Sequence, residues 1–125
     1  MMAGKKRVFI VEDHPSTALA MKRYLEESGY EVDLAADVRS ALRVAARNRF
    51  DVLVCDIHLP DGTGWDLMKQ LTARGAVNAI AFSAFDAPED RRRSKEAGFA
   101  AHVAKGSDTN LLLSTIEQVI EHKAA

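Results

Sequence analysis

Five polar side chains along this sequence are of the types that bind a divalent metal ion and transfer a phosphoryl group. The acidic pair Glu12-Asp13 comes at the end of an apolar run, and Asp56, Ser83 and Lys105 each directly follow another such run. Carboxylates brought together repel one another unless one stays protonated or a cation holds them, and Mg²⁺ prefers oxygen ligands while leaving positions free for a phosphate. We therefore expect Asp13 and Asp56 to be metal ligands. Asp56, facing a metal ion, a lysine and a hydroxyl, is also the best-placed nucleophile towards phosphorus.

The elements that must position these residues are short apolar runs that alternate with longer stretches of helical period. This alternation predicts βα units and a parallel sheet. The predicted strands are Arg7–Glu12, Glu31–Ala35, Val52–Cys55, Ala79–Phe82 and Ala100–Ala104. The second alternates polar and apolar residues, which indicates an edge strand, whereas the others are mainly apolar, as central strands covered on both faces tend to be.

The fold class predicted from this alternation is α/β: a doubly wound, five-stranded parallel sheet of the flavodoxin-like (βα)5 type. Ligands of open α/β sheets bind outside the carboxyl ends of the strands, where the strand order reverses. With the order 2-1-3-4-5, the first and third strands are neighbours there, and Glu12, Asp13 and Asp56 meet in one acidic crevice. Ser83 and Lys105 then lie on its far side.

Helix boundaries are marked by proline, small polar residues and glycine. Pro15 suits the first turn of a helix, and Asp37 precedes Val-Arg-Ser-Ala-Leu as an N-cap should. We expect Asp86 to open the fourth helix, and Ser107 or Asp108 to cap the last. The predicted helix ends are glycines that can adopt a left-handed backbone, namely Gly29, Gly75 and Gly98.

Length and composition limit the classes of protein that fit. The chain has 125 residues, of which 47% are hydrophobic and 28% charged, with a formal net charge of -1. This predicts one folded domain over residues 1–125, with a core from about 6 to 122 and no room for an output domain. The charge balance gives no reason to expect nucleic acid binding, and no apolar stretch reaches the roughly 18 residues of a membrane span. A lone Cys55 and a charged start without a signal peptide lead us to expect a cytoplasmic protein.

Four segments resemble the signature regions of response-regulator receiver domains, the phosphoacceptor domains of two-component and phosphorelay signalling. The resemblance covers roughly residues 6 to 122, and the segments come in the family's order at the ends of the predicted strands. They are VFIVEDH (Val8–His14), VLVCDIHLPDGTG (Val52–Gly64), AFSA (Ala81–Ala84) and HVAKG (His102–Gly106). Each segment alone is weakly specific, but the four together are highly specific.

The resemblance implies a metal site built around the phosphoacceptor. Asp56 matches the aspartate that carries the phosphoryl group in the family. Asp13 and Asp56 would bind Mg²⁺ directly, Glu12 would bind it through a water molecule, and His58 would contribute its backbone carbonyl. Mg²⁺ is the cofactor that the resemblance implies.

Two further residues would act on the phosphoryl group. Ser83 matches the hydroxyl residue that bonds a phosphoryl oxygen in the active state, and Lys105 matches the lysine that pairs with that group. The family takes its phosphoryl group from a phosphohistidine of a histidine kinase or histidine phosphotransfer protein and later hydrolyses it. The resemblance thus implies a signalling domain rather than a conventional enzyme, with only self-directed catalysis and a downstream protein target. Phosphorylation would pull Ser83 inward and shift the face formed by the fourth helix, fifth strand and fifth helix.

Two positions depart from the family pattern. His102 stands where Tyr or Phe is usual, as the switch residue that accompanies Ser83. Gly106 replaces the proline that usually follows the lysine, so we expect either a trans Lys105-Gly106 bond with a shifted loop or a strained cis bond. The bulky Phe85 either slows hydrolysis of the phosphoryl group or simply packs over the site.

The competing hypothesis is a receiver-fold module that binds proteins independently of phosphorylation. Such a module would not need Asp56, Asp13 and Lys105, whose presence speaks against it. The departures at His102 and Gly106 lend it some support.

Other phosphate-handling folds fit the sequence less well. A flavodoxin needs a phosphate loop rich in Ser, Thr and Gly after the first strand, where this chain has the acidic EDHPSTALA. Haloacid-dehalogenase phosphatases need two aspartates two positions apart, whereas Asp56 and Asp61 are five apart, and we interpret Asp61-Gly62 as a turn. The four histidines are scattered, which argues against a His-rich metal site.

Overall fold

The predicted apolar runs form the strands of one parallel sheet with helices on both faces. The computed structural model describes residues 4–123, so the first three and the last two residues of the predicted domain lie outside the described residues. The elements follow one another in the order β1 (Arg7–Val11), α1 (Pro15–Glu27), β2 (Glu31–Ala35), α2 (Val38–Arg47), β3 (Val52–Cys55), β4 (His58–Leu59), β5 (Gly62–Thr63), α3 (Gly64–Thr72), β6 (Ala79–Ser83), α4 (Pro88–Ala97), β7 (Ala101–Ala104) and α5 (Thr109–Lys123).

The strand order of the main sheet is β2-β1-β3-β6-β7, and every pairing in it is parallel. Counted along the five predicted strands, this is the order 2-1-3-4-5, which confirms the predicted topology and the edge position of β2. Three strand ends differ by one residue from the prediction: β1 ends at Val11, β6 extends to Ser83 and β7 begins at Ala101. The switch point therefore lies between β1 and β3, as expected.

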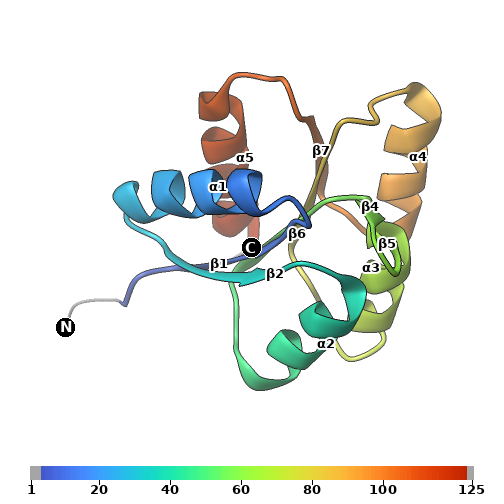
Figure 1. Cartoon of the computed structure of the whole chain (residues 1–125), viewed down its shortest axis with the longest axis horizontal. Helices are drawn as coiled ribbons and strands as arrows, with labels where there is room; N and C mark the ends of the chain where they lie inside the picture. The colour runs from blue at the N-terminus through green and yellow to red at the C-terminus, as the bar shows by residue number, and fades with distance from the viewer. Residues whose placement is uncertain (1–3, 124–125) are drawn as a thin grey trace.

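Side chains of the central strands alternate between the two faces of the sheet. In β1, Phe9 and Val11 pack with residues of α2, α3 and α4, whereas Val8 and Ile10 pack with residues of α1 and α5. All four are almost completely buried. Figure 1 shows the corresponding layers, with α1 and α5 on one side of the sheet and α2, α3 and α4 on the other. Burial on both faces explains why these strands are continuous apolar runs in the sequence.

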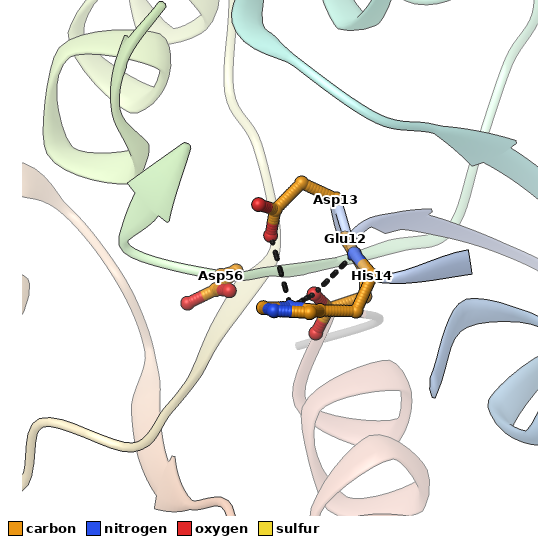
Figure 2. Close-up of side chains that lie close together, drawn as sticks. All are labelled: Glu12, Asp13, His14 and Asp56. Carbon is orange, nitrogen blue, oxygen red and sulfur yellow. Dashed lines mark hydrogen bonds and ion pairs between the residues drawn. The ribbon is translucent and has the colours of Figure 1, made fainter. Parts of the chain in front are cut away.

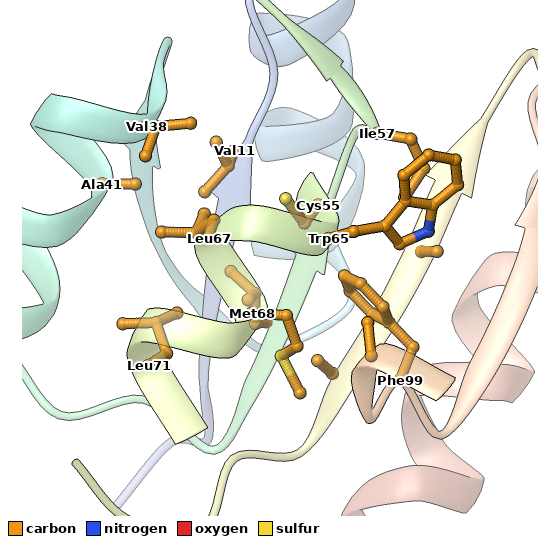
Figure 3. Close-up of a cluster of buried hydrophobic side chains, with 14 of the residues drawn as sticks. Val11, Val38, Ala41, Cys55, Ile57, Trp65, Leu67, Met68, Leu71 and Phe99 are labelled. Atoms are coloured by element: carbon orange, nitrogen blue, oxygen red, sulfur yellow. The ribbon is translucent and has the colours of Figure 1, made fainter. Parts of the chain in front are cut away.

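Helix α3 supplies large side chains to the first of these two layers. Trp65, Leu67, Met68 and Leu71 are buried and lie over the sheet beside Cys55, as Figure 3 shows. Trp65 and Met68 thus belong to the core, as does Cys55 of β3. Packing in this layer places the start of α3 next to the end of β3, the strand that precedes Asp56.

The last helix packs through one apolar stripe. Leu112, Ile116 and Val119 of α5 are buried in the second layer, as their spacing predicts. At 15 residues, α5 is the longest of the helices between residues 4 and 123. No helix in that range is both long enough and apolar enough to cross a membrane.

Three of the predicted helix starts are confirmed. Pro15 is the first residue of α1, and Asp37 caps α2 by accepting a hydrogen bond from the Ser40 N–H at 2.7 Å. Asp108 rather than Ser107 precedes α5, where its carboxylate accepts a hydrogen bond from the second N–H of the helix at 3.0 Å. These caps satisfy backbone groups that a helix end leaves without partners.

The predicted start of α4 is wrong by one position. Pro88 is the first residue of the helix, so the capping position belongs to Ala87 and not to Asp86. Asp90 accepts a hydrogen bond from the Ala87 N–H at 3.1 Å, while Asp86 forms an ion pair with Arg91 at 2.6 Å. The loop before α4 is thereby fastened to the helix.

An antiparallel hairpin of β4 and β5, which no pattern in the sequence predicted, follows β3. Pro60 and Asp61 form its turn. The Asp61 carboxylate reaches across to α2, where it accepts hydrogen bonds from the N–H groups of Val38 at 2.7 Å and Arg39 at 3.0 Å. The hairpin thus ties the start of α2 to the end of β3.

Candidate functional site

Glu12, Asp13 and Asp56 come together beyond the carboxyl ends of β1 and β3, which are paired in register there. The side chains of Glu12 and Asp56 are only 2% and 8% exposed, and that of Asp13 is 26% exposed. Ligand atoms of these three residues and of His14 all lie within 4.8 Å of one another (Figure 2). The fold therefore concentrates three carboxylates in one largely buried cluster.

His14 was not among the predicted site residues, yet its ring lies against this cluster. The imidazole Nδ1 is 3.2 Å from Glu12 Oε2 and 3.4 Å from Asp13 Oδ1. The backbone N–H of His14 also donates a hydrogen bond to Glu12 Oε2 at 3.1 Å (Figure 2). The side chain is 70% exposed, so it forms the rim of the site. Its position directly after the acidic pair is the signal that could have identified it.

Lys105 reaches across from the end of β7 and supplies positive charge to the cluster. Its ammonium donates hydrogen bonds to Asp56 Oδ2 at 2.9 Å and to Glu12 Oε1. Partial burial alone would lower the pKa of Lys105, but the hydrogen bonds to Glu12 and Asp56 outweigh burial and raise the pKa above its ordinary value. The lysine is therefore held as a cation between the two buried carboxylates.

The carboxylate oxygens of this cluster fit a hard divalent ion. Asp56 Oδ1 accepts a hydrogen bond from the Ile57 N–H at 2.7 Å, which together with Lys105 orients that carboxylate. Asp13 Oδ1 is buried and accepts no hydrogen bond from residues 4–123, although the His14 Nδ1 lies 3.4 Å from it. A buried carboxylate oxygen without a donor, beside a second carboxylate, is a suitable ligand for Mg²⁺.

Ser83 is the last residue of β6 and is fully buried. Its Oγ accepts a hydrogen bond from the Phe85 N–H at 3.0 Å, so the hydroxyl oxygen is engaged by the loop that follows β6. Phe85 is 51% exposed, and its ring packs against that of His58 in a tilted arrangement, with 4.1 Å between the ring centroids and 52° between the ring planes. Phe85 therefore lies with His58 at the surface near the site.

The two departures from the family pattern have defined conformations. The His102 side chain is only 4% exposed, with Nδ1 2.9 Å from Ser94 Oγ and Nε2 2.9 Å from the carbonyl oxygen of Phe85. The Lys105-Gly106 bond is trans, because the backbone between residues 4 and 123 contains no cis peptide bond. Gly106 has φ +123°, a left-handed backbone that favours glycine.

Comparison with known proteins places the site in a recognised sequence context. The family profile described as "Response regulator receiver domain" matches residues 8–117 of this chain. The sensory transduction protein RegX3 of Mycolicibacterium smegmatis is 33% identical over 117 residues, which cover 94% of this chain and 51% of RegX3. The transcriptional activator protein IrlR of Burkholderia pseudomallei is 27% identical over 119 residues, which cover 95% of this chain and 52% of IrlR. The chain thus spans about half the length of these two relatives.

Solved structures show the same architecture. A CheY-like response regulator receiver domain protein from Methanospirillum hungatei has a TM-score of 0.90 and 28% sequence identity, with 97% of this chain and 98% of that chain covered. The family match from residue 8 to residue 117 includes every site residue from Glu12 to Lys105.

Proposed function

Because the chain belongs to the response regulator receiver domain family, we propose that it accepts a phosphoryl group on Asp56 from the phosphohistidine of a kinase or phosphotransfer protein. Contacts with a downstream protein then transmit or relay the signal. The observation that carries the proposal is the buried Asp56 carboxylate, which lies beside Glu12 and Asp13 and is hydrogen-bonded to Lys105 at 2.9 Å. A carboxylate so oriented is equipped to attack phosphorus.

Mg²⁺ belongs to this proposal as the cofactor. Asp13 and Asp56 would hold the ion through their carboxylates and Glu12 would hold it through a water molecule. His58 would contribute its backbone carbonyl, as the resemblance to the family implies. When bound, the ion neutralises negative charge on the oxygens of the transferring phosphoryl group. The buried Asp13 Oδ1 without a hydrogen-bond donor supports this assignment.

The transfer is a displacement at phosphorus. A carboxylate oxygen of Asp56 forms a bond to phosphorus while the bond from phosphorus to the donor's imidazole nitrogen breaks, and that nitrogen keeps the electron pair and takes up a proton. The Lys105 ammonium, already 2.9 Å from Asp56 Oδ2, pairs with a phosphoryl oxygen, and the Ser83 hydroxyl bonds another. Later attack of water on phosphorus releases inorganic phosphate and restores the Asp56 carboxylate.

Intact-mass spectrometry after incubation with acetyl phosphate and Mg²⁺ tests the proposal directly. We expect a mass gain of one phosphoryl group that is lost in Asp56→Asn and in the absence of Mg²⁺. Asp66→Asn is the matched control, because Asp66 is an exposed aspartate at the start of α3.

A gain retained in Asp56→Asn would refute the assignment of the phosphoacceptor. No gain with acetyl phosphate, followed by no gain with a phosphohistidine donor, would refute the proposal as a whole. That result would favour the receiver-fold module that binds proteins independently of phosphorylation.

A further inference from the structure

We infer that His102 is a positioning residue whose ring holds the main chain of Phe85, and through it the hydroxyl of Ser83, in the conformation described above. The inference rests on the proposed function, in which Ser83 bonds the phosphoryl group. It assigns His102 a fixed hydrogen-bonding role in place of the switch role that the resemblance implies.

The partners of the His102 ring determine which nitrogen carries a proton. The Phe85 carbonyl oxygen can only accept, so Nε2 must donate the hydrogen bond at 2.9 Å. In the neutral ring Nδ1 then carries no hydrogen, so it accepts from the Ser94 hydroxyl at 2.9 Å, while Ser94 Oγ accepts a hydrogen bond from the Trp65 Nε1–H at 3.0 Å. The neutral ring is therefore the Nε2–H tautomer, and both of its nitrogens are hydrogen-bonded.

This chain of hydrogen bonds is anchored in buried structure. Trp65 in α3 is 6% exposed and Ser94 in α4 is 1% exposed, so these hydrogen bonds join α3, α4 and β7 inside the molecule. Buried hydrogen bonds are costly to break without replacement. These hydrogen bonds consequently hold the His102 ring in place, and the ring in turn holds the group that is bonded to its Nε2.

That other side is the loop between β6 and α4. The Phe85 N–H donates to Ser83 Oγ at 3.0 Å and the Phe85 carbonyl accepts from His102 at 2.9 Å, so this one residue is held at both ends of its main chain. The hydrogen bond from the Phe85 N–H leaves the Ser83 hydroxyl hydrogen free to donate to a phosphoryl oxygen, but the inward shift of Ser83 on phosphorylation requires the Phe85 main chain to move with it. His102 opposes that movement by holding the carbonyl.

A second connection between β7, α4 and the loop before α4 lies at the surface. The Arg91 guanidinium donates to the backbone carbonyl of His102 at 3.1 Å and pairs with Asp86 at 2.6 Å. The Arg91 and Asp86 side chains are 50% and 38% exposed, and exposed ion pairs contribute little to stability. Arg91→Gln is therefore a matched control for changes at His102.

Two substitutions separate the hydrogen bonds of His102 from its volume. His102→Phe keeps a ring but has no donor for the Phe85 carbonyl, whereas the amide nitrogen of His102→Gln can take the place of Nε2. We expect the amide hydrogen exchange of Phe85, measured by NMR without any ligand, to be roughly three- to tenfold faster in His102→Phe. His102→Gln and Arg91→Gln should stay near wild type, and the amides of Ile10 and Val54 in the central strands should be unchanged if the fold is intact.

Beryllium fluoride with Mg²⁺, a mimic of the phosphoryl group, gives a second measurement. His102→Phe should bind this probe roughly three- to tenfold more tightly than wild type, because Ser83 and the Phe85 main chain can move inward more easily. His102→Gln should restore the wild-type affinity. Side-chain ¹⁵N shifts of His102 should show the Nε2–H tautomer with and without the probe.

Three results would overturn the inference: an Nδ1–H tautomer, Phe85 exchange unchanged in His102→Phe, or probe affinity unchanged in that variant while wild type binds. Failure of the probe to bind any variant, wild type included, counts instead against the proposed function. In that case the exchange rates and the tautomer, which need no probe, still decide whether His102 holds the loop.

Discussion

Replacing Lys105 by methionine should destabilise the fold in the absence of Mg²⁺ and make its stability depend more strongly on the ion. The Lys105 ammonium donates hydrogen bonds to both buried carboxylates, those of Glu12 and Asp56. Methionine keeps much of the length of the side chain and removes its charge. The two carboxylates are then left side by side without this compensating cation.

The magnitude follows from burial. Removing one partner of a buried ion pair costs about 3–5 kcal/mol, because the remaining charge is uncompensated. The Lys105 side chain is 22% exposed while those of Glu12 and Asp56 are 2% and 8% exposed, so water screens part of the interaction. We expect Lys105→Met to lower the free energy of unfolding by about 2–3 kcal/mol without Mg²⁺. The variant should also bind Mg²⁺ more tightly than wild type, since the competing ammonium is gone.

Urea denaturation with a chelator and with saturating Mg²⁺ measures both effects. A Mg²⁺ concentration ten times the dissociation constant adds about 1.4 kcal/mol to the stability of any variant, so the comparison is made at equal free ion. Lys69→Met is the control, because Lys69 is an exposed lysine in the last turn of α3. A loss below about 0.5 kcal/mol in Lys105→Met, or a gain from Mg²⁺ no larger than that of wild type, would refute the reasoning.

Three further predictions concern other residues. A Cβ added to Gly64 would lie 2.4 Å from the carbonyl oxygen of Asp56, so Gly64→Ala should lower the free energy of unfolding by about 2–3 kcal/mol in thermal denaturation. Gly4→Ala, whose Cβ meets nothing within 4 Å, should change the stability little. Equal stability of the two variants would contradict this prediction. Asp61→Ala removes the acceptor for the first two N–H groups of α2 and should cost about 1 kcal/mol by urea denaturation, a loss that would not occur if those N–H groups needed no partner. Burial, and then the neighbouring carboxylates, raise the pKa of the Cys55 thiol. Above about pH 9 the thiol therefore loses its proton in the unfolded chain but keeps it in the folded chain. The free energy of unfolding should then fall by up to about 1.4 kcal/mol for each further pH unit. Cys55→Ala should lack this contribution, and an unchanged pH slope in that variant would show that the thiol is not its source.

Several features of the structure could not be predicted from local patterns in the sequence. The β4–β5 hairpin has strands of two residues each, too short for any periodic pattern. Asp61 caps a helix that begins 23 residues earlier in the chain, a contact that no local pattern reveals. Asp86 has the residue type of a cap, but the position of Pro88 moved the cap to Ala87.

The sequence by itself determined the class of fold and the place where carboxylates would gather. Strands buried on both faces must be apolar along their whole length, so β1 and β3 were recognisable, and their parallel register puts Glu12, Asp13 and Asp56 at one edge. The residue types and their order along the chain were enough to predict that much.

Only the tertiary structure decided how the remaining side chains meet this cluster. Lys105 contacts Glu12 across 93 residues, the His14 ring lies against the acidic pair, and the His102 ring is buried between α4 and the Phe85 carbonyl. These contacts depend on side-chain rotamers, which are selected by packing between elements that the sequence pattern does not place relative to one another. A sequence pattern therefore predicts which residues reach an edge of the sheet, while the packed fold selects which atoms touch there.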